Sequence, residues 1–145
     1  MDSLIQEMKV SLASTFAFYL KAHGFHWNVE GPNFPQYHEF LGDLWEESFG
    51  AVDPIAEHLR TLEAYAPASL SRYTELSIVK DELNIPNAMS MMTKLETDNA
   101  ALIVQLTKTQ GLAEQNKKMG LANFLQDRID AHEKHGWMLR SITKA

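Results

Sequence analysis

The stretch "HGFHWNVEGPNFPQYHEF", residues 23–40, separates two long helical patterns and contains three histidines. Its middle part, Asn28 to Pro35, holds two prolines, one glycine and two asparagines, a composition typical of a turn. Pro35 suits the first turn of the helix that follows, because no helical hydrogen bond needs its missing amide hydrogen there. The stretch therefore predicts a tight hairpin in which His26 ends one helix and His38 begins the next.

Apolar residues recur at spacings of three and four on both sides of this turn, which predicts helices over residues 2–27 and 35–63. The positions expected to face the core are Ile5, Met8, Leu12, Phe16, Tyr19 and Leu20, followed by Leu41, Leu44, Trp45, Val52, Ile55, Leu59 and Leu62. Pro54 lies inside the second helix, where it predicts a kink or a local bend.

The second half of the chain predicts another pair of helices, over residues 85–111 and from residue 112 or 118 to 143. Their expected core positions are Met89, Met92, Leu95, Ala100, Ile103 and Leu106, followed by Leu121, Phe124, Leu125, Ile129, His132, Gly136 and Leu139. The connection over residues 64–86 contains "SLSRYTEL", which predicts one or two helical turns. Two hairpins joined by one long crossover predict an all-α, ferritin-like four-helix bundle with a short extra helix, forming a single domain over residues 1–145.

The composition limits the chemistry. The 145 residues include no cysteine, so disulfides and thiolate metal sites are excluded, and any metal must bind to His, Asp or Glu, which suits iron, manganese or zinc. The net charge is −6 and the longest basic run is Lys117–Lys118, so there is no basic footprint for nucleic acid. With no membrane-length apolar run and no signal-peptide pattern, we expect a cytoplasmic protein.

Polar candidates share one face of the second helix, beside its core face: His38, Asp53 and Glu57. Asp53 and Glu57 are one turn apart, so their carboxylates are neighbours. His38 and Asp53, however, are about 22 Å apart on a continuous helix and cannot bind one ion within one chain. They can do so if this helix packs antiparallel to its copy about a two-fold axis, which predicts two equivalent sites per dimer.

Less specific interpretations stay open at this point. An Asp–Glu pair one turn apart is usually a solvated face. His23, His58, His132 and His135 are expected to be surface or hydrogen-bonded polar residues, although "HEKH" at residues 132–135 has the form of a weak zinc pair. Trp27 is expected to be a packing residue at the end of its helix.

These residues resemble the pattern of the Dps family, the mini-ferritins first described as DNA-binding proteins from starved cells. The family pattern is H-W-N-V-x-G-x-x-F-x-x-x-H followed by D-x-x-A-E-R, and this chain has "HWNVEGPNFPQYH" and "DPIAEH". The ligand spacings of 12, 15 and 4 residues match. The resemblance continues through "APASLSRYTELS" and "RIDAHEKHGWMLR", so it covers nearly the whole chain.

The resemblance implies a hollow dodecamer built from two-fold dimers. It implies a ferroxidase centre at each dimer interface, in which His26 and His38 act with the partner's Asp53 and the partner's Glu57. The implied activity is that of an oxidoreductase, which oxidises Fe(2+) to Fe(3+) with hydrogen peroxide preferred and dioxygen possible. Each shared site would take one or two irons. Ferric mineral would be stored inside the shell, which protects against oxidative damage.

The chain departs from the family pattern at three places. Gly42 stands where the family usually carries a carboxylate for a second iron. Asp43 points about 140° away from His38, so Glu46, at about 80°, is the better substitute ligand. His58 replaces an arginine of the family pattern. The lysine-rich N-terminal arm of the DNA-binding members is missing, so we do not expect DNA binding through the tails.

Other residues could also serve the proposed function, and other functions remain possible. Trp27 could donate an electron beside the site, and Asp127, Asp130 and Glu133 could line a pore or nucleate mineral, unless they are simply a solvated face. The first rival is a DNA-compacting nucleoid protein with little ferroxidase activity. A ferritin-type site inside one bundle is disfavoured, since no Glu is followed by His three residues later. The last rival is a silent helical shell or a zinc-binding relative.

Overall fold

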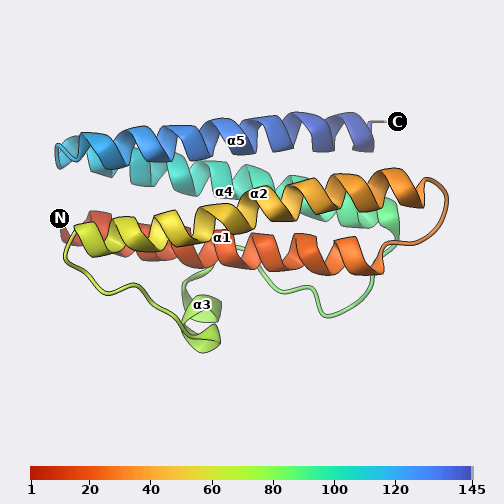
Figure 1. Ribbon diagram of the computed structural model, residues 1–145, viewed down its shortest axis with the longest axis horizontal. Coiled ribbons are helices and arrows are strands. Elements are labelled where there is room, and N and C mark those ends of the chain that lie inside the picture. The colour runs from red at the N-terminus through yellow and green to blue at the C-terminus, as the bar shows by residue number, and fades with distance from the viewer. Residues whose placement is uncertain (145) are drawn as a thin grey trace.

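The computed structural model describes residues 1–144, which form five helices: α1 (Asp2–Asn28), α2 (Phe34–Thr61), α3 (Leu70–Leu76), α4 (Ala88–Gln115) and α5 (Met119–Thr143). The long helices lie side by side as two antiparallel hairpins, α1–α2 and α4–α5, and the crossover between them runs along the bundle (Figure 1). The short α3 lies outside the bundle, next to α1. The predicted four-helix bundle with a short extra helix is confirmed. None of the helices in the described residues is long and apolar enough to cross a membrane.

The turn between α1 and α2 contains two residues with positive φ. Gly31 has φ 100° and Asn33, the residue that precedes α2, has φ 67°. Glycine and asparagine adopt this left-handed region at a lower cost than other residues, which explains their use here. Pro35 occupies the first turn of α2, as predicted. The tight turn brings the end of α1 beside the start of α2, and with it His26 beside His38.

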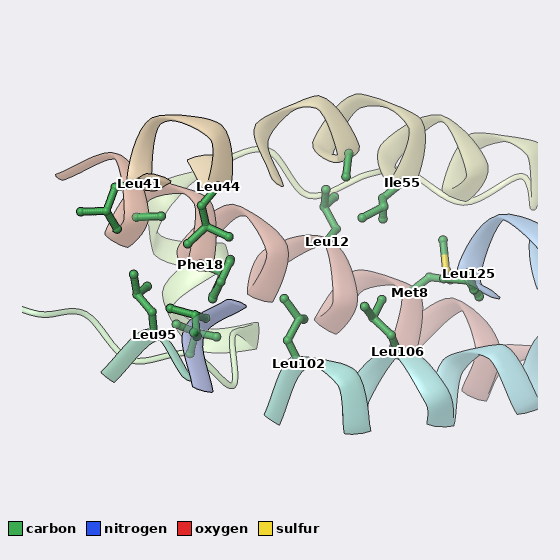
Figure 2. Packing of buried hydrophobic residues seen from close by; sticks show 14 of the residues in the cluster. Met8, Leu12, Phe18, Leu41, Leu44, Ile55, Leu95, Leu102, Leu106 and Leu125 are labelled. Atoms are coloured by element: carbon green, nitrogen blue, oxygen red, sulfur yellow. The ribbon is translucent and has the colours of Figure 1, made fainter. Parts of the chain in front are cut away.

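The core is built from leucines, with methionines and Phe18, contributed by all four long helices (Figure 2). Fully buried side chains include Met8, Leu12 and Phe18 of α1, Leu41 and Ile55 of α2, Leu95, Leu102 and Leu106 of α4, and Leu125 of α5. A buried hydrogen bond of 2.9 Å between the hydroxyls of Ser11 and Thr109 also ties α1 to α4. These contacts hold α2 along one side of the bundle and leave Asp53 and Glu57 exposed.

Several predicted helix ends were wrong by a few residues. α4 begins at Ala88 rather than Ile85, because the Asn87 side chain accepts a hydrogen bond from the Ser90 amide at 2.9 Å and caps the helix there. It also continues through Gly111 to Gln115. Pro54 lies inside α2 as predicted, and the helix stays continuous from Phe34 to Thr61. This continuity keeps the two ends of the polar face of α2 far apart.

The buried face of α1 was predicted only in part. Leu20 is 44% exposed, and Phe16 and Tyr19 are only partly buried, whereas Phe18 and Phe25 belong to the core. Residues 16–20, "FAFYL", are apolar all round, so periodicity alone could not choose the inner face. On α4, the predicted core positions Met89 and Ala100 are exposed in the same way.

Candidate metal centre

His26 and His38 hold each other in place through their backbone carbonyls. His26 Nδ1 donates to the His38 carbonyl at 2.7 Å, and His38 Nδ1 donates to the His26 carbonyl at 2.8 Å. The rings stack with their centroids 3.8 Å apart and 15° between their planes. A carbonyl only accepts, so each Nδ1 carries the hydrogen, and the neutral form of each ring has its lone pair on Nε2. The pair therefore presents two oriented Nε2 atoms that fit a cation.

Gly42 lies one turn after His38 and makes room for the His26 ring. A Cβ at position 42 would lie 3.1 Å from His26 Cε1 and 3.3 Å from His26 Nδ1. Any side chain there would press on the edge of the imidazole. Gly42, where the chain differs from the family pattern, thus lets α2 lie close to the ring of His26.

Asp53 and Glu57 are exposed on α2, one turn apart, as predicted. Since α2 is unbroken, Asp53 lies about 22 Å along the helix from His38. Within residues 1–144, no group of three His, Asp or Glu side chains is placed to hold a metal ion. One chain therefore brings the two histidines together and leaves the two carboxylates at a distance.

Asp43 and Glu46 are both exposed on α2. Burial lowers the pKa of His23, His26 lowers it further, and the negative charge of Glu46 opposes this shift. Glu46 is therefore close enough to His23 to act on it electrostatically.

His23 is held between two tryptophans. Its ring stacks on Trp45 with 3.8 Å between centroids and 9° between planes, and Trp27 lies 4.1 Å away on a tilted plane. His23 Nδ1 is 3.0 Å from the Tyr19 hydroxyl. His23 is thus a packed, hydrogen-bonded residue, as expected, and Trp27, at 61% exposure, covers it from solvent on one side.

A buried polar network that the sequence did not predict links α2 to α5. Arg128 donates to both carboxylate oxygens of Glu47, at 2.5 and 2.9 Å. His135 Nε2 donates to Glu47 Oε1 at 2.8 Å. Burial alone would raise the pKa of Glu47, but hydrogen bonds from His135 and Arg128 outweigh burial and hold it well below its usual range. Glu47 is thus kept as a carboxylate beside the bundle interior.

The same network extends from α5 to α4 through His132. Asn99 Oδ1 accepts from His132 Nδ1 at 2.8 Å, and Arg128 Nη2 donates to His132 Nε2 at 3.1 Å. Both ring nitrogens are used, so "HEKH" is not a zinc pair. Burial and the charge of Arg128 lower the pKa of His132 well below its ordinary value. The sequence did contain a sign of this network: Arg128 lies one turn before His132, and His135 lies one turn after it, so all three side chains share one face of the helix.

The remaining candidate residues lie elsewhere on α2 and α5. Asp127, Asp130 and Glu133 are exposed on α5, a placement that suits both a pore or nucleation role and a solvated face. The His58 ring packs against Phe124, with 4.6 Å between centroids, and burial lowers the pKa of His58. His58, which stands at the arginine position of the family pattern, therefore packs against an aromatic ring.

Comparison with known proteins gives matches that cover nearly the whole chain. Residues 5–145 match the Ferritin-like domain family. The "DNA protection during starvation protein" of Brevibacillus brevis is 32% identical over 132 residues, which cover 90% of this chain and 88% of the relative. The crystal structure of antigen TpF1 from Treponema pallidum superposes with a TM-score of 0.95 at 29% identity, covering 99% of this chain and 93% of the other.

A second solved structure has the same fold. It is a Dps protein from Vibrio cholerae O1, described as a member of a broad superfamily of ferritin-like diiron-carboxylate proteins. Its TM-score is 0.94 at 26% identity, with 99% of this chain and 90% of the other covered. The chain therefore belongs to the Dps family of ferritin-like proteins.

Proposed function

We propose that the protein is a ferroxidase that oxidises ferrous iron and stores the ferric product. The observation that carries this proposal is the histidine pair, in which both Nδ1 atoms are bonded to carbonyls and both Nε2 atoms are left to bind iron. Two neutral imidazoles and two carboxylates form a nitrogen and oxygen ligand set that suits ferrous iron. Iron is here the substrate, and the protein supplies its ligands.

The site is shared between two subunits. His26 and His38 of one subunit act with the partner's Asp53 and the partner's Glu57, because about 22 Å of continuous helix separates His38 from Asp53 within one chain. A two-fold axis makes the contact reciprocal, so each dimer carries two identical sites. Both carboxylates are exposed in the single chain and free to reach across such an interface.

The reaction needs electrons to pass from ferrous iron to an oxidant, with hydrogen peroxide preferred over dioxygen. The carbonyl bonds hold His26 and His38 in one tautomer and one orientation, so the ligands need little rearrangement when iron binds. Glu46 or Asp43 could help to hold a second iron, since Gly42 supplies no carboxylate. The ferric product would move to an acidic surface for which Asp127, Asp130 and Glu133 are candidates.

Storage requires an enclosed space, which a single bundle of this size does not have. The proposal therefore includes the dodecamer that the family resemblance implies, assembled from two-fold dimers in the cytoplasm. Removing ferrous iron and peroxide together limits the formation of hydroxyl radicals, so the same reaction protects the cell against oxidative damage.

DNA compaction is the second candidate, because the relative from Brevibacillus brevis carries DNA protection in its name. A net charge of −6 and the lack of a basic run longer than two residues weigh against direct contact with phosphates. Protection of DNA by removing iron needs no such contact. A gel shift with duplex DNA at low and moderate salt separates the two, and we expect no shift at moderate salt.

The ferroxidase proposal is tested by anaerobic mixing. Ferrous iron is added at two ions per subunit, followed by one equivalent of peroxide, and ferric absorbance is recorded. We expect Asp53→Asn to slow iron oxidation by about 100-fold or more, because even residues that only support a metal ligand cost up to that much when changed. Asp53 is exposed, so this near-isosteric change should leave the fold intact.

Glu39→Gln is the matched control, since it removes another exposed carboxylate from α2. Its iron oxidation should follow the wild-type curve. Equal rates for wild type, Asp53→Asn and Glu39→Gln would rule out the proposed site.

A further inference from the structure

A column of aromatic rings contributed by α1 and α2 runs from the histidine pair. It consists of Trp27, His23, Trp45 and Tyr19, with His23 at its centre. His23 lies 4.1 Å from Trp27 and 3.8 Å from Trp45, centroid to centroid, and Trp45 lies 5.9 Å from Tyr19. We call this set the aromatic column. Its rings follow one another at separations over which an electron passes without an added carrier.

The aromatic column begins at a proposed iron ligand. The His26 ring is 6.4 Å from Trp45 and 6.0 Å from His23, and Trp27 is the next residue in the chain. Among these rings, only Trp45 has a buried polar atom, Nε1, that makes no hydrogen bond within residues 1–144. The Trp45 indole is therefore a ring through which an oxidant formed at His26 and His38 can draw an electron.

Tyr19, which lies beside both Trp45 and His23, is equipped to be the electron donor. A phenol that loses an electron also loses its proton, and it is oxidised more easily when an acceptor for that proton is already hydrogen-bonded. The Tyr19 hydroxyl donates to His23 Nδ1 at 3.0 Å when His23 carries its hydrogen on Nε2. Among Tyr19, Tyr37, Tyr65 and Tyr73, only Tyr19 has a histidine hydrogen bond within residues 1–144.

The electron count creates a need for such a donor. Hydrogen peroxide takes up two electrons, whereas one ferrous ion supplies one. Two irons per site would meet the demand, but Gly42, one turn after His38, offers no side-chain ligand for a second. A site loaded with a single iron must find its second electron in the protein or release a hydroxyl radical.

We propose that Tyr19 supplies this second electron through Trp45, with His23 taking the phenol proton. The proposal rests on the ferroxidase function above. One ferrous ion, one peroxide and the Tyr19 phenol give one ferric ion, a neutral Tyr19 phenoxyl radical, one water and one hydroxide. The peroxide O–O bond breaks, iron and Tyr19 each lose one electron, and the phenol proton, passed on from His23, ends in the water. The radical is held inside the protein in place of a free hydroxyl radical.

The test loads the assembled protein with one ferrous ion per site under argon, adds one equivalent of peroxide, and freezes the mixture for electron paramagnetic resonance. The wild type should show a tyrosyl signal, which tyrosine deuterated on its ring would narrow. Tyr19→Phe keeps the ring packing and should lose this signal, while a spin trap in solution should then capture more hydroxyl radical. Tyr65→Phe, which changes an 83% exposed tyrosine outside the aromatic column, should leave both readings unchanged.

A parallel run with two ferrous ions per site separates this inference from the ferroxidase proposal. If wild-type protein fails to oxidise iron there, the ferroxidase proposal fails. If it oxidises iron normally but Tyr19→Phe retains the full tyrosyl signal and traps no additional hydroxyl radical, only the electron-donor role of Tyr19 is overturned.

Discussion

At the scale of single residues, the candidate centre depends on how closely α2 approaches the end of α1. Gly42 permits this approach, because a Cβ there would lie 3.1 Å from His26 Cε1. The approach in turn allows the two short bonds between the histidine rings and the carbonyls, at 2.7 and 2.8 Å. A glycine in mid-helix costs about 1 kcal/mol relative to alanine, so Gly42 lowers helix stability while it makes room for a ligand.

We therefore expect Gly42→Ala to slow iron oxidation without lowering the stability of the fold. Alanine favours the helix, but the added methyl group must displace the His26 ring by a few tenths of an ångström. Iron oxidation should slow by about tenfold, the range seen when the orientation of a ligand is disturbed, while urea unfolding shows little or no loss of stability.

Gly111→Ala is the control, since a Cβ there meets nothing within 4 Å. It should gain up to about 1 kcal/mol in unfolding free energy with no change in the oxidation rate. Wild-type oxidation by Gly42→Ala would show that the close contact with His26 has no bearing on the site.

The sequence predicted that one tight turn brings His26 beside His38, and the structure confirms this neighbourhood, while the ligand roles of His26, His38, Asp53 and Glu57 stay predictions. It could not predict the bonds between rings and carbonyls, since these depend on how the two helix ends meet in space. The role of Gly42 was likewise visible only as a missing carboxylate.

At the scale of elements, α2, α4 and α5 are joined by the network of Glu47, Arg128, His132 and Asn99. His132 fits this network only as a neutral ring, because Nε2 faces the Arg128 guanidinium and must accept. Its pKa is therefore well below 6.5 in the folded protein. The unfolded chain has no such restriction, and this difference couples the helix packing to pH.

The folded protein should lose stability as the pH falls from 7 to 5. Below about 6.5 the unfolded chain binds a proton at His132 and the folded protein does not, which costs up to about 1.4 kcal/mol per pH unit. Glu47, whose pKa is lowered by folding, adds a further loss below about 4.5, where the unfolded carboxylate becomes protonated. Urea unfolding at several pH values and one protein concentration measures both.

His132→Gln keeps a polar side chain and removes the titrating ring, so its stability should vary less between pH 7 and 5 than that of the wild type. His58→Gln serves as the control, since the His58 ring is only partly buried and most of the slope should remain. An unchanged slope in His132→Gln would contradict the account of the network.

Helices were easier to predict than their buried faces. The periodicity of α2 and α5 identified their inner residues, such as Ile55 and Leu125, because one face of each helix is clearly more polar. In α1 the apolar run over residues 16–20 gave no such contrast, and small polar residues such as Ser11 and Thr15 proved to be fully buried. Which side of α1 faces inward depends on the helices packed around it.

At the scale of the whole molecule, the proposed activity requires more than one copy of the chain. The described residues leave Tyr65, Leu70 and Leu83 largely exposed, at 83%, 71% and 89%. All three lie in α3 or in the crossover on either side of it, on the outside of the bundle (Figure 1). Association of subunits would cover apolar surface of this kind.

We expect the purified protein to have a mass near twelve times its subunit mass of 16.5 kDa, measured by light scattering after gel filtration. Because apolar contacts are little affected by screening, this mass should persist at high salt. A monomer under all conditions would contradict the shared site and the storage function together.

The measurement that tests the central claim most directly mixes two inactive variants. Subunits with His38→Ala and subunits with Asp53→Ala are unfolded together, reassembled and assayed for iron oxidation by peroxide. In a mixed two-fold dimer, one site receives both changes and the other receives neither, so random pairing should restore about a quarter of the sites. Each variant reassembled alone should stay inactive. Recovery near a quarter of wild-type activity would establish that each site is shared between two subunits, and no recovery in a well-assembled mixture would contradict it.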